Sequence, residues 1–236
     1  TVDLTAATGN SPRITGTVAT SAFTMNAGQQ MWLIADGAWP LTHNATTNNI
    51  VGGASITLAA GARVFVFKDL SGIIQTIPFK ADGTAVVVAV TAFIADQKAT
   101  GTAGGTFTSG AWRTRDLNTE LYDASGIVSV ASNQFTLAAG TYLIEWSVPA
   151  HKTDAHKSRL YNATDAVEIT IGTAESAAAA DGTTNRSMGL ATVTLTASKA
   201  LEIQHYGTTT TATNGFGTAT GFSAVETYTL VKITKI

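Results

Sequence analysis

A short pattern occurs four times in this chain, and it constrains the fold more than any other feature. Each copy has an apolar residue, a Thr, a Leu or Met, a small Ala-Gly or Ala-Ser corner, and then a run rich in apolar positions. The copies are FTMNAGQQMWLI from Phe23, SITLAAGARVFVF from Ser55, FTLAAGTYLIEW from Phe135 and VTLTASKALEIQ from Val193. Alternating apolar residues that stop at a small corner and resume after it predict two strands joined by a tight turn. The pattern therefore predicts four β-hairpins, two in each half of the chain.

The rest of the first half fits the same all-β interpretation. Strand signals separated by Gly, Asn and Asp turns predict strands at residues 13–18, 22–25, 30–35, 55–58, 63–68 and 73–79. The run Val64-Phe65-Val66-Phe67 is apolar on both faces, which predicts a central strand that is covered on both sides. No helical period of ten residues or more occurs.

The second half resumes the alternation. Tyr142, Ile144 and Trp146 predict one buried face of a strand, and the chain closes with a predicted strand at 227–236. We expect two tandem β-sandwich, jelly-roll-like domains. They are an N-terminal module at 1–82 and a C-terminal head at 106–236, with an apolar strand and Gly-rich linker at 83–105. The apolar run at 85–95 either lies between the domains or opens the second one.

Composition limits the kinds of partner. Charged residues make up only 13% of the chain, about half the roughly 25% of an ordinary soluble domain. The solvent-facing side must then consist largely of Thr, Ser, Asn and Ala, a surface common among extracellular and virion proteins. The net charge is -2 without a basic run, which argues against a nucleic-acid partner. The chain has no Cys, which excludes disulfides and thiolate metal sites.

Membrane insertion is not predicted. The longest apolar stretch, residues 85–95, is well short of the ~20 residues that cross a bilayer. The chain starts at Thr1 without a signal-peptide pattern. It is expected to be processed or to be part of a longer polypeptide.

Catalytic motifs are missing from the sequence. There is no nucleophile elbow, phosphate loop, zinc-protease helix or dinucleotide fingerprint, and Gly215-Phe216-Gly217 lacks the third glycine of the last of these. Asp116, Glu120 and Asp123 lie close in sequence, as in a paired-carboxylate or Ca²⁺ site, but we interpret them as a solvated turn. We expect no enzyme and no cofactor.

The closest approach to a metal cluster is His151, Asp154 and His156. The loop that holds them, residues 149–159, also carries two lysines and an arginine, whose positive charge opposes cation binding. We expect no metal site here but a rim loop, with contact to a ligand as the alternative. His205 continues an apolar face and is expected in a core or an interface.

The second half resembles a known fold family. The segments that carry the likeness are FTLAAGTYLIEWSV, SRLYNATDAVEI, VTLTASKALEIQ and ETYTLVKITKI. They are similar to the jelly-roll heads of the complement-type globular domain and the tumour necrosis factor superfamily, a fold recurrent in phage fibre tips. A Phe-Thr pair followed by Gly-x-Tyr is matched by Phe135, Thr136, Gly140 and Tyr142. The last strand departs from the family's usual spacing, and the loops are longer.

The first half is similar to small β-sandwich modules of phage tail and head fibres. The segments that carry this likeness, over about residues 1–80, are DLTAATGNSPRITGTV, NAGQQMWLIADG and TLAAGARVFVFKDLSGIIQTI. Both resemblances imply a homotrimeric, non-enzymatic protein.

Aromatic residues outside the strand cores supply the candidate contact residues: Trp39, Trp112, Tyr161, Phe216 and Phe222. Such rings stack on sugars or fill subunit interfaces. With the family resemblance, we expect a trimer interface containing Tyr142, Trp112 and Tyr228. Receptor contacts are expected in loops that carry His151, His156, Phe216 and Phe222.

The function that follows is that of a virion structural protein, a fibre or spike on tail or head that attaches to a host cell. It would join other virion proteins through its N-terminal side and bind a glycan or protein on the host surface. The alternatives are a monomeric carbohydrate-binding module or bacterial surface adhesin, and a glycan-degrading enzyme, which the missing catalytic constellation disfavours.

Overall fold

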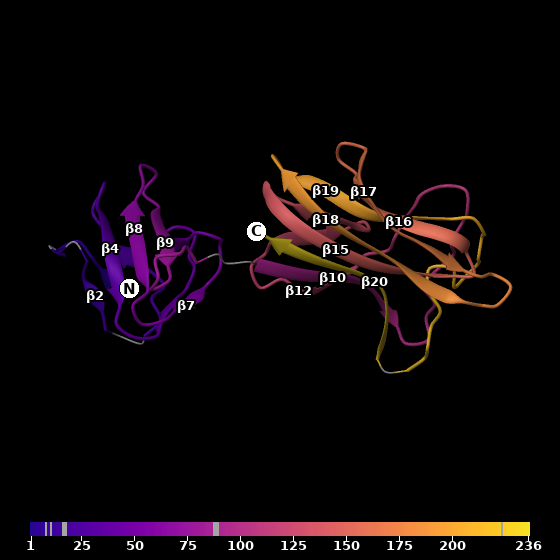
Figure 1. The fold of residues 1–236 in the computed structure, drawn as a ribbon, viewed down its shortest axis with the longest axis horizontal. Helices are drawn as coiled ribbons and strands as arrows, with labels where there is room; N and C mark the ends of the chain where they lie inside the picture. The colour runs from indigo at the N-terminus through magenta and orange to yellow at the C-terminus, as the bar shows by residue number, and fades with distance from the viewer. Residues whose placement is uncertain (8, 10, 16–17, 87–89, 223) are drawn as a thin grey trace. The chain divides into compact units, whose positions relative to one another are not determined.

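The computed structural model describes residues 1–236 except 8, 10, 16–17, 87–89 and 223. Every regular element among the described residues is a β-strand, which confirms the predicted all-β class. The chain divides into two compact units, Thr1–Val90 and Thr91–Ile236 (Figure 1). The described residues contain no helix long and apolar enough to span a bilayer.

Unit 1 has one larger sheet and two strand pairs. Its strands are β1 (Val2–Asp3), β2 (Arg13–Ile14), β3 (Phe23–Thr24), β4 (Gln30–Ala35), β5 (Trp39–Leu41), β6 (Asn49–Ile50), β7 (Ile56–Leu58), β8 (Arg63–Lys68) and β9 (Ile74–Phe79). The larger sheet has the order β2-β4-β8-β9-β6, and the pairs are β1-β3 and β5-β7. The six strands expected from the sequence are therefore present; of the one expected at 13–18, the structure shows Arg13–Ile14, and residues 16–17 lie outside the described residues.

The core of unit 1 lies against one face of its larger sheet. Alternation along β8 buries Val64 and Val66 completely, whereas Phe65 and Phe67 on the opposite face are half-buried. The strand is central, as expected, but the structure corrects the expectation that both of its sides are covered. The outer face of the sheet therefore carries aromatic side chains that water reaches.

Unit 2 is built from longer strands. They are β10 (Val90–Ala99), β11 (Arg113–Thr114), β12 (Thr119–Tyr122), β13 (Val128–Ala131), β14 (Gln134–Leu137), β15 (Gly140–His151), β16 (Asp154–Asn162), β17 (Val167–Ala177), β18 (Thr184–Leu195), β19 (Lys199–Gly207) and β20 (Val225–Lys235). The closing strand expected at 227–236 is β20.

Two sheets of unit 2 enclose its core. One has the order β12-β10-β20-β15-β18, and the other has the order β13-β14-β19-β16-β17 with β11 paired to β19. Strands that neighbour in a sheet are mostly distant in sequence, as β14 with β19 and β15 with both β18 and β20. This is the double-sheet order of a jelly roll, so the predicted fold of the second half is confirmed. The buried faces meet between the sheets at Phe135, Ile144, Leu160, Ile203 and Ile233.

The four copies of the repeated pattern are corners and not hairpins. In every copy the strand before the small corner and the strand after it belong to different sheets: β3 and β4, β7 and β8, β14 and β15, β18 and β19. Each corner carries the chain across the core. The hairpin prediction is wrong because alternation shows which face of a strand is buried but not which strand lies beside it.

The two corners of unit 2 pair with each other. β14 leads into one corner and pairs with β19, which leaves the other; β15 and β18 pair in the opposite sheet. Phe135 is thus opposite Leu201 in one sheet, and Tyr142 is opposite Val193 in the other. The repeated pattern therefore closes one end of the sandwich.

The segment expected as a strand and linker at 83–105 is placed largely in unit 2. β10 lies between β12 and β20, but the division between the two units falls inside the apolar run. Ala85 pairs with Phe79 and Val86 packs on the core of unit 1, whereas residues 91–95 open unit 2; residues 87–89 lie outside the described residues. The glycines that follow are bound as well. Gly104 N donates to Gly217 O at 2.9 Å, and Gly105 N donates to Thr213 O at 2.9 Å.

Candidate assembly and ligand-binding surfaces

The expected trimer-interface residues lie mostly inside unit 2. Tyr142 is 1% exposed, faces the core, and donates its hydroxyl to Ala138 O at 3.1 Å. Tyr228 is buried and donates to Thr102 O at 2.7 Å. A side chain buried so completely within one copy presents no surface to a second copy. Trp112 is half-buried, with its ring 4.2 Å from the guanidinium of Arg159.

Of the four residues expected to contact a receptor, only Phe222 is exposed, at 77%. Phe216 is buried, with its ring between the Arg115 guanidinium at 4.1 Å and the Phe107 ring at 5.1 Å. His151 and His156 are buried too. The structure replaces the expected rim loop by β15 and β16. β15 ends in a run of four buried residues that includes His151, and alternation along β16 turns His156 inward.

Two of the histidines form a buried pair, His156 with His205, which lie far apart in sequence. Nδ1 of His156 lies 2.9 Å from Nε2 of His205, while Nδ1 of His151 lies 2.8 Å from the Thr184 hydroxyl. Burial lowers the pKa of His156 to about 4, with Glu175 opposing the shift. Burial likewise lowers the pKa of His205 well below its usual value. Both rings are therefore neutral at pH 7.

The carboxylates that we considered for catalysis or metal binding have structural partners. Asp116 forms an ion pair with Lys98 at 2.7 Å, Asp123 accepts hydrogen bonds from the backbone at 127 and 128, and Glu120 accepts one from Val130 N. Asp154 accepts from Ala179 N and from the Thr209 hydroxyl. No cluster of three potential metal-ligating side chains occurs in the part of the chain that the structure describes.

Arg115 is the buried group that sequence reasoning missed. It is 0% exposed and donates to Thr229 Oγ1, Pro149 O and Phe216 O at 2.8–3.2 Å. Burial lowers its pKa to about 9, so the guanidinium stays charged at neutral pH. The three hydrogen bonds tie β15, β20 and the segment that holds Phe216 together. A lone Arg before an Asp in sequence gives no signal of this role.

The two outer faces of unit 2 differ in chemistry. On the β13-β14-β19-β16-β17 sheet, Arg159 donates to Gln204 Oε1 at 2.8 Å and forms an ion pair with Glu168 at 3.0 Å. Gln134 donates to Glu202 Oε2 at 3.0 Å on the same sheet. On this face the polar side chains bond to one another, and Glu202 and Gln204 are buried beneath their partners.

The opposite outer face carries large apolar side chains on four of its five strands. We call it the apolar face and define it by five residues that are 40–61% exposed: Phe93, Tyr122, Met188, Leu190 and Leu230. Strand register aligns them, because residues directly opposite in a sheet share a face. One row runs from Met188 through Ser147 to Leu230, and the next begins at Leu190 and passes through the ion pair of Glu145 and Lys232.

The apolar face is hollowed and extends around the edge of the sandwich. A groove of about 430 Å³ lies among Phe93, Met188, Leu190 and Leu230. A second groove of about 460 Å³ lies at the β17–β18 edge, where Ile171 joins Met188 and Leu190. The two grooves share Met188 and Leu190, so the apolar side chains of the sheet face adjoin those of the edge, with Ser147 and the Glu145–Lys232 ion pair among them.

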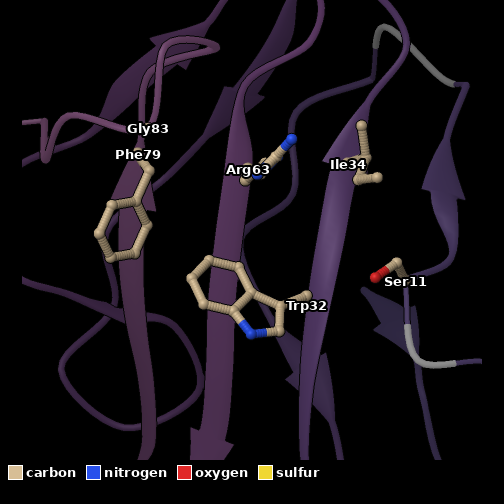
Figure 2. A pocket seen from close by; sticks show the side chains of 6 residues that line it. All are labelled: Ser11, Trp32, Ile34, Arg63, Phe79 and Gly83. Carbon is tan, nitrogen blue, oxygen red and sulfur yellow. The ribbon is translucent and has the colours of Figure 1, made fainter.

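Unit 1 has a separate pocket of about 340 Å³ on the outer face of its larger sheet. Its lining residues are Ser11, Trp32, Ile34, Arg63, Phe79 and Gly83. Figure 2 shows the Trp32 ring at the centre, Phe79 on one side of it, Ile34 and Ser11 on the other, and Arg63 above. The pocket is apolar with a cationic group at its margin.

Comparisons with known proteins give likenesses for the fold only. No family model matches the sequence, and no curated protein matches it. Among solved structures, murine APRIL at pH 8.0 is similar with a TM-score of 0.42 and 8% identity, over 63% of this chain and 100% of that one. The globular domain of zebrafish complement 1qA gives 0.39 and 13%, over 63% and 96%. Eiger TNF from S. frugiperda gives 0.38 and 12%, over 63% and 92%. The jelly-roll assignment rests on the strand order itself.

Proposed function

We propose that this protein is a homotrimeric, non-catalytic fibre or spike protein of a virion that acts in attachment to the host cell. The observation that carries the proposal is the apolar face of unit 2. Monomeric proteins seldom expose a contiguous apolar surface of this kind, and assembly would cover it. The polar network on the opposite face marks the side that stays in water.

The placement of the apolar surface favours a ring. Face and edge adjoin at Met188 and Leu190, but the face also contains Phe93 and Leu230 and the edge contains Ile171. The edge of one copy can therefore pack on the face of the next, and such head-to-tail contacts form a ring when the rotation between copies closes. The resemblance of the second half to complement-type and tumour necrosis factor heads implies that this cycle has three members. Three copies would present three equal sets of loops, which suits weak multivalent binding.

The virion role is supported by the composition and by the chain's organisation. Only 13% of residues are charged, no Cys is present, and two β units follow one another. Unit 1 would join other virion proteins, and the protein would act outside the cell. A monomeric carbohydrate-binding module is the second candidate, and the aromatic pocket of unit 1 is the observation that favours it.

Binding to whole cells by an assembly-deficient variant tests the attachment function. We expect the labelled wild-type protein to bind at least one member of a panel of bacterial strains. Replacing Leu190→Glu together with Leu230→Glu places charge on the apolar face and should weaken that binding about 100-fold or more, because avidity is lost. Leu70→Glu is the matched control, since Leu70 is fully exposed in a turn of unit 1. Equal cell binding by the double variant and the wild type contradicts the proposal.

A further inference from the structure

The outer face of the larger sheet in unit 1 brings aromatic rings and one arginine into register. Alternation along β4 turns Trp32 and Ile34 outward while Leu33 is buried. Trp32 is opposite Phe65 on β8, and Ile34 is opposite Arg63, which is opposite Phe79 on β9. Three adjacent strands thus supply the side chains, and rigid strands hold a site more accurately than loops do.

The rings support one another and leave the indole open to solvent. The Trp32 ring lies 5.1 Å from Phe65 and 5.2 Å from Phe79, with tilts of 42° and 47°. Trp32 nevertheless remains 39% exposed. An indole held in place by two neighbours loses little further freedom when a ligand stacks on it, which favours binding.

The charge at this pocket has no internal counterion. The four aspartates of unit 1 are engaged elsewhere: Asp3 with Thr5, Asp36 with Arg13, Asp69 with Gln75, and Asp82 with Thr84. Among the described residues, the Arg63 side chain makes no hydrogen bond and no ion pair. A guanidinium offers paired donors that match a carboxylate.

We propose that this pocket binds an acidic sugar, a pyranose ring that bears a carboxylate. The apolar face of the ring would stack on Trp32 beside Phe79, since aromatic faces accept C–H groups and exclude water. The carboxylate would pair with Arg63. The volume of about 340 Å³ suits one or two sugar rings, at the lower end of small-ligand sites.

An anionic sugar fits this pocket better than a second copy of the chain does. An interface between copies would cover a broad surface, and it would still require an anion opposite Arg63, yet the aspartates of unit 1 are already occupied. The inference deepens the proposed attachment function by naming the class of receptor, and its biological role rests on that function. All lining residues come from one copy, so the site itself does not depend on assembly.

Saturation-transfer NMR on the full chain tests the site, because it observes the sugar and not the protein. The probes are 3′-sialyllactose and sodium glucuronate, with lactose and glucose as their neutral counterparts. We expect the acidic sugars to bind with a Kd of about 1 mM or tighter and the neutral ones at least about 10-fold more weakly. Arg63→Gln should remove that difference, and Trp32→Ala should abolish binding of both classes.

Lys157→Gln is the control, because it removes the same charge from an exposed strand position in unit 2. Both variants in unit 1 replace exposed side chains, and an unchanged melting temperature confirms that they fold. The proposal is overturned if no acidic sugar binds at about 20 mM, or if Arg63→Gln leaves the preference for acid intact. It is equally overturned if Trp32→Ala changes the assembled mass, which would make this face an interface between copies.

The same samples separate the two proposals. A trimeric mass without sugar binding contradicts the proposed sugar site but supports the proposed assembly. Sugar binding by a protein that is monomeric at every concentration contradicts the proposed assembly but supports the proposed sugar site.

Discussion

At Gly189, on β18, the structure has no room for a side chain. Trp146 lies opposite it on β15, and a Cβ atom added to Gly189 would overlap the indole ring. The ring cannot move freely, because its Nε1 donates to Ser158 Oγ in the other sheet at 2.8 Å. We therefore expect Gly189→Ala to lower the free energy of unfolding by about 3 kcal/mol, as overpacking of a core does.

Chemical unfolding followed by circular dichroism measures this loss. Gly37→Ala is the control, since a Cβ at Gly37 meets nothing within 4 Å and its φ is not in the left-handed region. Equal stability of Gly189→Ala and the wild type would show that Trp146 is packed differently from this account.

The buried pair of His156 and His205 makes stability depend on pH. Both pKa values lie below 6.5 in the folded chain, about 4 for His156, chiefly because of burial. The unfolded chain therefore binds protons below pH 6.5 that the folded chain does not, and stability present above that pH is lost as the pH falls toward 4. The loss is about 1.4 kcal/mol per pH unit for each histidine.

Free energies of unfolding at pH 7 and pH 5 test this dependence, because carboxylates titrate mostly below that interval. Replacing His156→Gln together with His205→Gln should remove most of the difference in the free energy of unfolding between pH 7 and pH 5. Burial also lowers the pKa of His151. The double variant should therefore keep a smaller difference in stability between the two pH values. A wild-type protein equally stable at both pH values contradicts the buried, neutral pair.

At the scale of residues, the sequence predicted which side chains are buried better than it predicted what those side chains do. The alternation of Tyr142, Ile144 and Trp146 correctly indicates a core face. The family resemblance led us to expect Tyr142 in a trimer interface, whereas its side chain is 1% exposed and packs in the core of its own unit. Arg115 was missed because its partners are two carbonyl groups and a hydroxyl from distant segments, and no local pattern marks a donor that binds them.

At the scale of elements, the small corner is the unit that repeats. In the first two copies the corner is a tight turn, with Gln29 N donating to Asn26 O and Ala62 N donating to Ala59 O at 3.1 Å. The third residue of each turn is a glycine in the left-handed region, Gly28 with φ 72° and Gly61 with φ 80°. An Ala-Gly pair thus supplies the conformation that such a turn requires.

Gly28 isolates this backbone requirement, because a Cβ there meets nothing within 4 Å. We expect Gly28→Ala to destabilise unit 1 by about 1 kcal/mol from its positive φ alone. Gly28→Asn should cost less, since Asn tolerates the left-handed region. The melting temperatures of the Gly28→Ala and Gly28→Asn proteins test this difference. Equal melting temperatures would argue against a left-handed conformation at Gly28.

Strand existence was predictable, whereas strand pairing was not. Period-two alternation located β4, β8 and β9 within a residue, because burying one face imposes that period. Pairing depends on where distant strands meet, so the corners were misread as hairpins. β5 was missed because it holds only Trp39, Pro40 and Leu41, too short a run for alternation and interrupted by a residue that strands avoid.

The apolar face was also missed at this scale. In β18, Met188 and Leu190 point outward while Ala191 and Val193 point inward. Apolar residues on both faces are a signal of a strand covered on both sides. That signal is present in SMGLATVTL, although β18 is at the edge of its sheet.

At the scale of the whole molecule, unit 2 combines a sandwich closed by sheet-crossing corners with an exposed apolar face. The corners determine which residues fill the core, and the remaining apolar residues of the β12-β10-β20-β15-β18 sheet lie outside it. Composition sharpens the contrast, because a chain with 13% charged residues has few charges with which to keep such a face in water.

The mass of the wild-type protein in solution, measured by multi-angle light scattering over a range of concentrations, tests the central claim most directly. One chain has a mass of 24.3 kDa. We predict a mass three times that value, which falls when Leu190→Glu and Leu230→Glu are combined. A mass of one chain at every concentration would contradict assembly through the apolar face.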